Sequence, residues 1–526
     1  MKNPTIALIH PPVVKPSEPP AGIARLAGAL RAHGVNCTVI DANIEGLCYL
    51  LDSSLAGEDT WSRRAHRHLG QHLNCLRNPQ GYPNADQYRR AVADLGRVLS
   101  QAGRREEIKV GLGDYEDAHL TPVRRDHLLR AAQEPRRNPF HNYFYSRLLP
   151  RLAQHQPVMV GISINYLSQA LCGFALAGLI RQTLPEVKLA LGGGLITSWM
   201  RRPQGLEPFA GLIDTLVAGP GEWPLLQALG RPIETRRYKP DYSDLSANSY
   251  FSPGFILPFS ASNGCWWRRC DFCPEQAEGG RFHPLPHSFA IVQLQHLVAQ
   301  TRPRLIHLLD NAISPALLRR LADQPPGAPW YGFVRIGPPL DDPIFCHGLA
   351  QSGCVMLKIG LESGSQQVLD RLHKGIQLNM ATRVLDNLRT AGIAAYVYLL
   401  FGTPAEDEAA AQATLDFVVD HHEAIDFLNT AIFNLPIGGP DAQGLQLRDF
   451  YDGDLAMYRD FIHPSGWQRA AVRRFVEKIF KKHPAIQPII RRDPPVFTSN
   501  HAAFFTTAGL QSNAVPARPG LAQVPK

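Results

Sequence analysis

The sequence has no long block of lysine or arginine, although these residues outnumber aspartate and glutamate by 54 to 46 and give a formal net charge of +8. Because acids lie among the bases, solvated surface explains this charge better than a nucleic-acid face does. The first residues lack the basic and apolar regions of a signal peptide. One uncharged run, 158–180, contains polar side chains that lipid would disfavour. We expect a buried strand and helix there, and no membrane partner.

A disulfide framework is also missing from the pattern of cysteines. The chain has nine cysteines, an odd number, and only three of them are clustered. The others lie mostly in apolar contexts that suit buried free thiols: Cys37, Cys48, Cys75, Cys172, Cys346 and Cys354. This usage favours a reducing, cytoplasmic environment. At 526 residues, the chain is long enough for two or three domains.

The three clustered cysteines are Cys265, Cys270 and Cys273, on a loop that follows an extended apolar segment, 254–260. Thiolates at this density are ligands for zinc or for an iron–sulfur cluster. Three of them leave a structural zinc site one ligand short of four. His283 or His287 could complete such a site, but prolines interrupt their segment and disfavour a helix that would present both imidazoles.

The segment 262–274, Ser-Asn-Gly-Cys-Trp-Trp-Arg-Arg-Cys-Asp-Phe-Cys-Pro, resembles the signature of the radical S-adenosylmethionine (radical-SAM) superfamily. That signature is Cys-x3-Cys-x2-Cys with an aromatic residue before the last cysteine, the place of Phe272 here. This chain has Cys-x4-Cys, and some members of the family carry the variant Cys-Tyr/Trp-Trp-x-x-Cys-x-Phe-Cys. The resemblance implies that the three cysteines hold a 4Fe–4S cluster whose open iron chelates S-adenosylmethionine. Reductive cleavage would then give a 5′-deoxyadenosyl radical.

Strand-like and helical stretches alternate through residues 250–445 and make six βα repeats. We therefore expect a partial (β/α)6 barrel of the TIM type, with its functional groups at the C-terminal mouths of the strands. Asp310 and Arg335 are expected at the ends of the second and third strands. Asp310 could accept a hydrogen bond from the ammonium group of S-adenosylmethionine, and Arg335 could pair with its carboxylate. Each residue also has an ordinary structural interpretation as a salt-bridge partner.

The segment Ile-Gly-Leu-Glu-Ser-Gly-Ser, 359–365, resembles the radical-SAM segment that holds the adenosyl ribose and backbone. The resemblance implies that Glu362, Ser363 and Gly364 contact S-adenosylmethionine. Glu362 can accept hydrogen bonds from hydroxyls, and Gly364 permits close approach. Lys374-Gly375 follows at the spacing typical of that family.

Residues 1–235 predict a doubly wound parallel α/β domain of the Rossmann type. Strand, helix and strand follow one another within the first 40 residues, and the pattern resumes at 158. The insertion between them, about 42–154, has helical stretches and an aromatic cluster at 138–145. We expect a helical cap over the sheet; interleaved aromatics and bases leave nucleic-acid binding as the alternative.

The layout His-Pro-Pro, Gly-Ile-Ser, a Gly-Gly turn and Gly-x-Gly-Glu resembles the cobalamin-binding domain that precedes many radical-SAM barrels. Without the resemblance, tight turns would explain the glycines equally well. The residues that it implies at the corrin and nucleotide-tail pocket are Ser163, Gly192, Gly193, Gly194, Gly219, Gly221 and Glu222. The Asp-x-His-x-x-Gly motif, which supplies a cobalt ligand in other cobalamin proteins, is absent, as it is in many domains of this subgroup. His10 could take that place, although a histidine beside two prolines is more often structural.

Residues 446–526 predict a mostly helical C-terminal extension. Apolar side chains recur at helical spacing over 467–479 among basic ones, and this helix is expected to pack on the barrel. The apolar segment 497–505 could also dock there, and the composition from 514 onward suggests a frayed end.

These observations and resemblances together predict a cobalamin-dependent radical-SAM enzyme, most simply a methyltransferase acting on an unactivated carbon. Its substrate would be a small molecule or a peptide, and its electron donor a protein such as flavodoxin or ferredoxin. A radical rearrangement or peptide modification without methylation is the alternative within the family. A zinc-stabilised nucleic-acid-binding protein is the alternative from another class.

Overall fold

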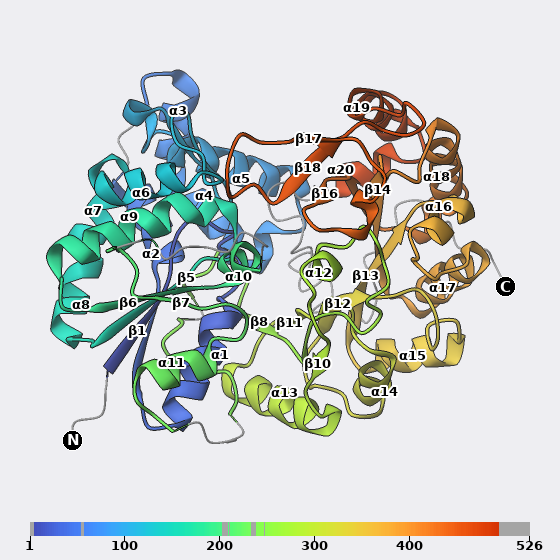
Figure 1. Ribbon diagram of the computed structural model, residues 1–526. Coiled ribbons are helices and arrows are strands. Elements are labelled where there is room, and N and C mark those ends of the chain that lie inside the picture. The colour runs from blue at the N-terminus through green and yellow to red at the C-terminus, as the bar shows by residue number, and fades with distance from the viewer. Residues whose placement is uncertain are drawn as a thin grey trace.

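The computed structural model describes residues 5–53, 57–201, 209, 211–232, 238–246 and 248–493. It contains two parallel sheets that lie side by side, each with its own helices (Figure 1). The apolar segment 497–505 and the end from 514, for which docking and fraying were expected, lie outside the described residues. No helix in the described ranges is both long and apolar enough to cross a membrane.

The first sheet has five parallel strands in the order β2-β1-β5-β6-β7. Their bounds are β1 (Thr5–His10), β2 (Asn36–Asp41), β5 (Met159–Ser163), β6 (Lys188–Gly192) and β7 (Thr215–Leu216). Numbered one to five along the chain, these strands have the order 2-1-3-4-5, which is that of flavodoxin-like domains. Such domains bind ligands where the strand order reverses direction. Here that point lies between the carboxyl ends of β1 and β5.

Helices cover both faces of this sheet. Figure 1 shows α9 (Leu167–Thr183) on one side, and α1 (Ala21–Ala32) and α11 (Glu222–Ala228) on the other. The uncharged run 158–180 forms β5 and most of α9, in which twelve successive residues, 169–180, are buried. This confirms the expectation of a buried strand and helix. Helix α10 (Gly194–Met200) follows β6 directly.

The insertion between β2 and β5 is mainly helical, as expected, and packs over the first sheet (Figure 1). Its helices are α2 (Ala42–Ser53), α3 (Thr60–Arg67), α4 (Leu69–Arg77), α5 (Ala85–Leu99), α6 (Arg125–Gln133), α7 (His141–Tyr143) and α8 (Leu149–His155). It also holds a short hairpin of β3 (Ile108–Val110) and β4 (Tyr115–Asp117). Three aromatic residues of the expected cluster lie inside it, since Phe140, Tyr143 and Phe144 are at most 2% exposed, whereas Tyr145 is 61% exposed. The first three are therefore core residues.

The second sheet has six parallel strands in the order β15-β14-β13-β12-β11-β8, so every strand pairs with its neighbour in the repeat. The strands are β8 (Ile256–Phe259), β11 (Leu305–Leu308), β12 (Trp330–Val334), β13 (Cys354–Glu362), β14 (Ala394–Phe401) and β15 (Phe427–Ile432). The helices outside them are α13 (His287–Thr301), α14 (Pro315–Asp323), α15 (Pro343–Gln351), α16 (Gln366–Arg371), α17 (Leu378–Ala391) and α18 (Glu408–Asp420). The six predicted βα repeats and the α/β fold class are confirmed.

Local sequence signals begin and end these helices. The Ser314 hydroxyl accepts the amide N–H of Leu317, and Pro315 occupies the first position of α14. Asp342 and Pro343 repeat the arrangement at α15. Helix α17 ends at Gly392, whose φ of 75° is left-handed and easily adopted by glycine.

Three short antiparallel strands that the sequence did not predict lie at the junction of the barrel and the C-terminal extension. These are β16 (Leu435–Pro436), β17 (Leu447–Asp449) and β18 (Tyr458–Phe461). Helices α19 (Arg469–Lys478) and α20 (Gln487–Arg492) follow. Phe475 of α19 is buried against Phe401 of β14, with ring centroids 6.1 Å apart, as expected for a helix that packs on the barrel. Two- to four-residue strands are too short to show an alternating pattern.

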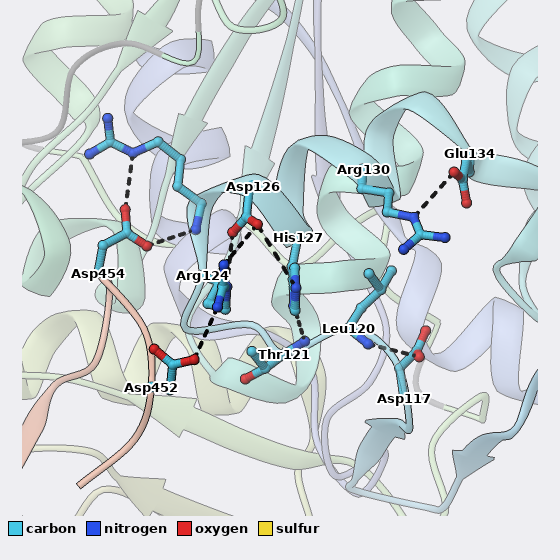
Figure 2. Close-up of polar contacts among 11 residues, drawn as sticks. Asp117, Leu120, Thr121, Arg124, Asp126, His127, Arg130, Glu134, Asp452 and Asp454 are labelled. Carbon is cyan, nitrogen blue, oxygen red and sulfur yellow. Dashed lines mark hydrogen bonds and ion pairs between the residues drawn. The ribbon is translucent and has the colours of Figure 1, made fainter. Parts of the chain in front are cut away.

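A loop of this extension returns to the insertion, and we call residues 452–455 the clasp. Figure 2 shows Asp452 and Asp454 facing Arg124 and the start of α6. Arg124 Nη1 lies 3.0 Å from Asp452 Oδ2, and the Arg125 amide donates to Asp454 Oδ1 over 2.9 Å. Leu455 is buried, and its amide N–H donates to the Val123 carbonyl over 2.8 Å. The clasp thus joins segments more than 300 positions apart.

Candidate functional site

The three cysteines lie on the loop that leaves β8 and leads into α12 (Pro274–Ala277). All three are half-buried free thiols, and the remaining cysteines are free as well. Burial raises the pKa of the Cys270 thiol, while the nearby charges of Lys374 and Arg335 act in the opposite direction. Burial also raises the pKa of Cys273, and the backbone N–H groups of 275 and 276 oppose it. The loop therefore offers positive charge and N–H donors to thiolates.

The cysteine loop is fastened to the turn at 372–375, which follows α16. Trp267 Nε1 donates to the His373 carbonyl over 3.1 Å, and the Asp271 carboxylate lies 2.6 Å from His373 Nδ1. Gly375 has a φ of 67°, and a Cβ there would lie 2.1 Å from the Trp267 ring. Only glycine permits this contact.

Arg335, directly after β12, connects that turn to the cysteines. Its guanidinium lies 3.9 Å from the centroid of the Trp267 ring, and Nη2 donates to the Lys374 carbonyl over 2.5 Å. Nη1 is 4.0 Å from Cys270 Sγ. Within the protein, the guanidinium of Arg335 thus contacts a sulfur, a carbonyl and an indole, and its predicted pairing with the carboxylate of S-adenosylmethionine stays a prediction. The paired tryptophans 266–267 in the sequence were the signal for this stacking.

Glu362 and Lys374 form a nearly buried ion pair at the end of β13, with 2.7 Å between Lys374 Nζ and Glu362 Oε1. Lys374 also lies 5.4 Å from the centroid of the Phe272 ring, which places the aromatic residue of the cysteine motif beside Glu362. Glu362 has a left-handed φ of 68°, uncommon for a residue with a side chain. Lys374 therefore connects four predicted site residues: it contacts Glu362, Phe272 and Arg335, and its charge acts on Cys270.

Three of the predicted residues, Asp310, Ser363 and Gly364, also make contacts within the fold. Both oxygens of buried Asp310 are engaged, because Oδ2 accepts the Ala261 amide over 3.0 Å and Oδ1 accepts the Ser262 hydroxyl. Burial raises the Asp310 pKa, and the bond from Ser262 opposes this. Ser363 and Gly364 pack on α18: a Cβ on Gly364 would lie 2.7 Å from the Ala413 carbonyl oxygen. Close approach at Gly364 thus serves the helix in this structure.

No group of three or more His, Cys, Asp or Glu side chains in the described ranges is arranged to hold a single metal ion. His287, considered as a fourth zinc ligand, lies 3.4 Å from the Ser314 hydroxyl through Nε2, and His283 is exposed on β10 (His283–Pro284). A four-iron cluster attaches each thiolate to a different iron, so its ligands need not converge on one point. The donor set of three thiolates among cations fits such a cluster.

A glycine-rich pocket of about 550 Å³ lies at the carboxyl ends of β1, β5 and β6. All the residues expected at the corrin line it: Ser163, Gly192, Gly193, Gly194, Gly219, Gly221 and Glu222. Gly22 and Gly219 have no atom within 4 Å of an added Cβ, so side chains there would project into open space. Gly193 has a second reason to be glycine, because its φ is 106° and a Cβ would lie 2.3 Å from the Ile164 carbonyl oxygen. The pocket is a cradle that larger residues would fill, and the glycines leave room in it for a bulky ligand.

The barrel side of this pocket is formed by the cysteine loop, through Asn263, Glu275 and Glu278. Buried Glu222 accepts Arg25 Nε over 2.6 Å, and Arg25 Nη1 lies 3.4 Å from Asn263 Oδ1. The pocket of the first sheet is thus bounded on one side by the segment that carries the three cysteines. His10 is not part of it: it lines a separate cavity, and burial lowers its pKa to about 4.

The fold of this chain is similar to that of solved cobalamin-dependent radical-SAM enzymes. One similar solved structure is the radical S-adenosylmethionine methyltransferase TsrM from Kitasatospora setae with cobalamin and a 4Fe–4S cluster bound, at a TM-score of 0.52 and 17% identity, covering 86% of this chain and 81% of that chain. A second is the cobalamin-dependent S-adenosylmethionine radical enzyme OxsB with aqua-cobalamin bound, at a TM-score of 0.50 and 15% identity, covering 82% of this chain and 53% of that chain. No protein-family model matches the sequence, and no curated protein matches it significantly. At these identities the likeness shows the fold.

Proposed function

We propose that the protein is a cobalamin-dependent radical-SAM enzyme. The observation that carries the proposal is the common boundary between the glycine-rich pocket and the cysteine loop, at which Asn263 and Glu275 line the same cavity as Gly192 and Gly219. A ligand in that pocket would lie beside whatever the three thiols hold. Two cofactors that act in sequence on one substrate require such an arrangement.

In this proposal Cys265, Cys270 and Cys273 ligate the cluster, and Arg335 and Lys374 stabilise its negative charge. Arg335 is well suited to this, because its guanidinium is held flat on Trp267 and directed toward Cys270. When bound, the cluster supplies an electron for reductive cleavage of S-adenosylmethionine, and cobalamin supplies a methyl group. The Glu362 carboxylate, oriented by Lys374, accepts hydrogen bonds from the ribose.

Methyl transfer to an unactivated carbon of a small molecule or peptide is the reaction that we propose. It is supported by the fold shared with TsrM, a methyltransferase whose structure has also been solved with tryptophan as substrate. The proposal includes an external one-electron donor such as flavodoxin or ferredoxin, because the described chain has no second cluster of cysteines. Asp310 and Gly364 remain predicted contacts of S-adenosylmethionine, although both already have partners within the fold.

The test is anaerobic reconstitution of the protein with iron and sulfide, followed by iron and sulfide analysis and ultraviolet–visible absorption. Four irons per chain and a broad cluster absorption are expected. A colourless protein that binds one zinc would refute the proposal and favour a structural zinc site. The matched variants are Cys270→Ala and Cys48→Ala, both of half-buried cysteines.

Cys270→Ala is expected to abolish cleavage of S-adenosylmethionine, measured as 5′-deoxyadenosine, and to leave cobalamin binding intact. Cys48→Ala is expected to retain both properties, because Cys48 lies in the insertion, away from the cysteine loop. Retained cleavage in Cys270→Ala would contradict the ligand assignment. Loss of cobalamin binding in that variant would show that the two sites are not independent.

A further inference from the structure

A second cavity, of about 640 Å³, lies between the segment that follows β1 and the strand ends of the barrel. Residues 14–23 form much of its first wall, and residues of β11, β12 and β13 form the other. It adjoins the glycine-rich pocket, because Gly22, Ile23 and Ser163 line both. Its volume is within the range of small-molecule sites.

Three ionisable side chains in this cavity form a row. The Glu18 carboxylate lies 2.9 Å from His307 Nδ1, and His307 Nε2 lies 3.2 Å from Lys358 Nζ. They come from the segment after β1, from β11 and from β13, so the row forms only when the two domains are packed together. Sequence separations of 51 and 289 positions concealed it from sequence analysis.

The two contacts of His307 determine its tautomer. A carboxylate oxygen accepts a hydrogen bond from an imidazole N–H, so in this pair Nδ1 carries the proton. Nε2 then has a lone pair and accepts from the Lys358 ammonium. The ring is also held in place by Tyr331, stacked on it at 4.4 Å between centroids. Glu18 and His307 therefore position a proton acceptor beside Lys358.

Lys358 is in a setting that favours loss of its proton. It is 1% exposed and lies 4.8 and 4.9 Å from the ring centroids of Tyr331 and Phe333. Burial lowers its pKa to about 8; the charge of Glu18 opposes this, and that of Lys15 adds to it. Asp114 and Asp310 are the other carboxylates that line the cavity. Both protonation states of Lys358 are thus populated near neutral pH.

We propose that this cavity binds the substrate and that Lys358 exchanges a proton with it, with His307 and Glu18 as positioning residues. In the forward direction the neutral amine takes a proton from an N–H, O–H or activated C–H of the ligand and becomes an ammonium. That proton passes to His307 Nε2 as the Nδ1 proton moves to Glu18. Charge is conserved and no electron is transferred, so the step needs no co-reactant. The identification of the ligand as substrate rests on the proposed function; the reactive amine does not.

The cavity favours a ligand that is neutral or zwitterionic. Its two lysines, Lys15 and Lys358, are balanced by Glu18 and Asp114, and buried Asp310 has a raised pKa. Neutral side chains supply most of the remaining walls, both apolar ones such as Val14, Leu309 and Phe333 and polar ones such as Asn165 and Asn311. A dianion such as a phosphate ester would lose its hydration without gaining a net positive partner. His10 Nδ1, buried and without a hydrogen-bond partner among the described residues, offers a further polar atom at the wall.

The experiment measures the acetylation rate of each lysine in the folded, iron-free protein between pH 6 and 10, by peptide mass spectrometry. Neutral acetic anhydride and anionic sulfosuccinimidyl acetate are the two probes, and exposed Lys188 of β6 is the internal reference. With acetic anhydride, labelling of Lys358 is expected to be half-maximal near pH 8, whereas that of Lys188 continues to rise toward pH 10. The anionic reagent is expected to label Lys358 at least tenfold more slowly relative to Lys188.

Two variants test the row. Glu18→Gln removes a charge that stabilises the ammonium and is expected to lower the Lys358 midpoint, and Lys15→Gln removes a repulsive charge and is expected to raise it. The proposal is overturned if Lys358 stays unlabelled at pH 9, if its midpoint equals that of Lys188, or if the two variants do not shift it in opposite directions. Equal labelling by the anionic reagent would overturn the ligand class. Because no cluster is present, these outcomes do not depend on the radical chemistry.

Discussion

Glu406 carries a buried carboxyl group that is expected to make the barrel less stable as the pH rises. It lies between β14 and α18 and is 1% exposed. Its Oε2 accepts the Gly402 amide and, over 3.2 Å, the indole N–H of Trp467, so it connects the barrel to the C-terminal extension. Its Oε1 is buried with no hydrogen-bond partner among the described residues. Burial raises the pKa of Glu406 from 4.5 to about 7.

The difference between these two pKa values sets the sign and the size of the pH effect on stability. The pKa of Glu406 is higher in the folded state than in the unfolded state. The contribution of Glu406 to the free energy of unfolding is therefore fully present below pH 4.5 and is lost as the pH rises through about 7. At 1.36 kcal/mol per pKa unit, the loss is about 3 kcal/mol. Glu406→Gln keeps an oxygen that can accept both hydrogen bonds and cannot ionise. We therefore expect it to be up to ~3 kcal/mol more stable than the wild type at pH 8 and of similar stability at pH 5.

The assay is urea unfolding of the iron-free protein at pH 5 and pH 8, followed by tryptophan fluorescence. With a slope of about 3 kcal/mol per molar urea, the variant's midpoint should exceed that of the wild type by ~1 M at pH 8 only. Glu408→Gln is the control, because Glu408 is exposed two positions further along, at the start of α18. A difference between Glu406→Gln and the wild type that is the same at both pH values would refute the reasoning.

Three glycine substitutions test the site. The leucine of Gly22→Leu projects into the glycine-rich pocket and should weaken cobalamin binding at least tenfold without lowering the unfolding temperature. The control is Gly96→Leu, in an equally open helical position of α5, which should bind cobalamin as the wild type does. Equal cobalamin affinities of the two variants would contradict the pocket assignment. Gly375→Ala must displace Trp267 and should lower the iron content after reconstitution, so full iron content would argue against the fastening of the loop. Gly364→Ala places a Cβ 2.7 Å from atoms of α18 and should lower the free energy of unfolding by about 1–3 kcal/mol. If the variant instead keeps its stability and no longer binds S-adenosylmethionine, Gly364 contacts that ligand directly.

The fold could be predicted because its signals are local. Strand and helix periods, caps such as Ser314 and Asp342, and the glycine turn after β6 are each contained within a few residues. The cysteine loop was equally local, since Cys265 to Cys273 span nine residues. The alternation of elements predicted six repeats for the same reason.

The partners of the predicted site residues could not be read in this way. Asp310 is held by the Ser262 hydroxyl, 48 positions away, and Arg335 reaches the Lys374 carbonyl, 39 positions away. Such contacts depend on which strand ends meet, and a sequence shows only that a strand ends. The contact of Gly364 with α18 illustrates the ambiguity, because a glycine that permits close approach does not specify what approaches.

The clasp gives the chain the topology of a closed ring. From Arg125, inside the insertion, the chain continues through α7 and α8, passes through both sheets and comes back to the insertion at Leu455. The exposed ion pairs of Asp452 and Asp454 are weak at physiological salt, whereas the buried Leu455 and the indole of Trp199, which donates to its carbonyl over 3.1 Å, are insensitive to salt. A single protease cut between the two contact points would therefore open the ring without releasing either half, and the nicked protein should still migrate as one particle under native conditions.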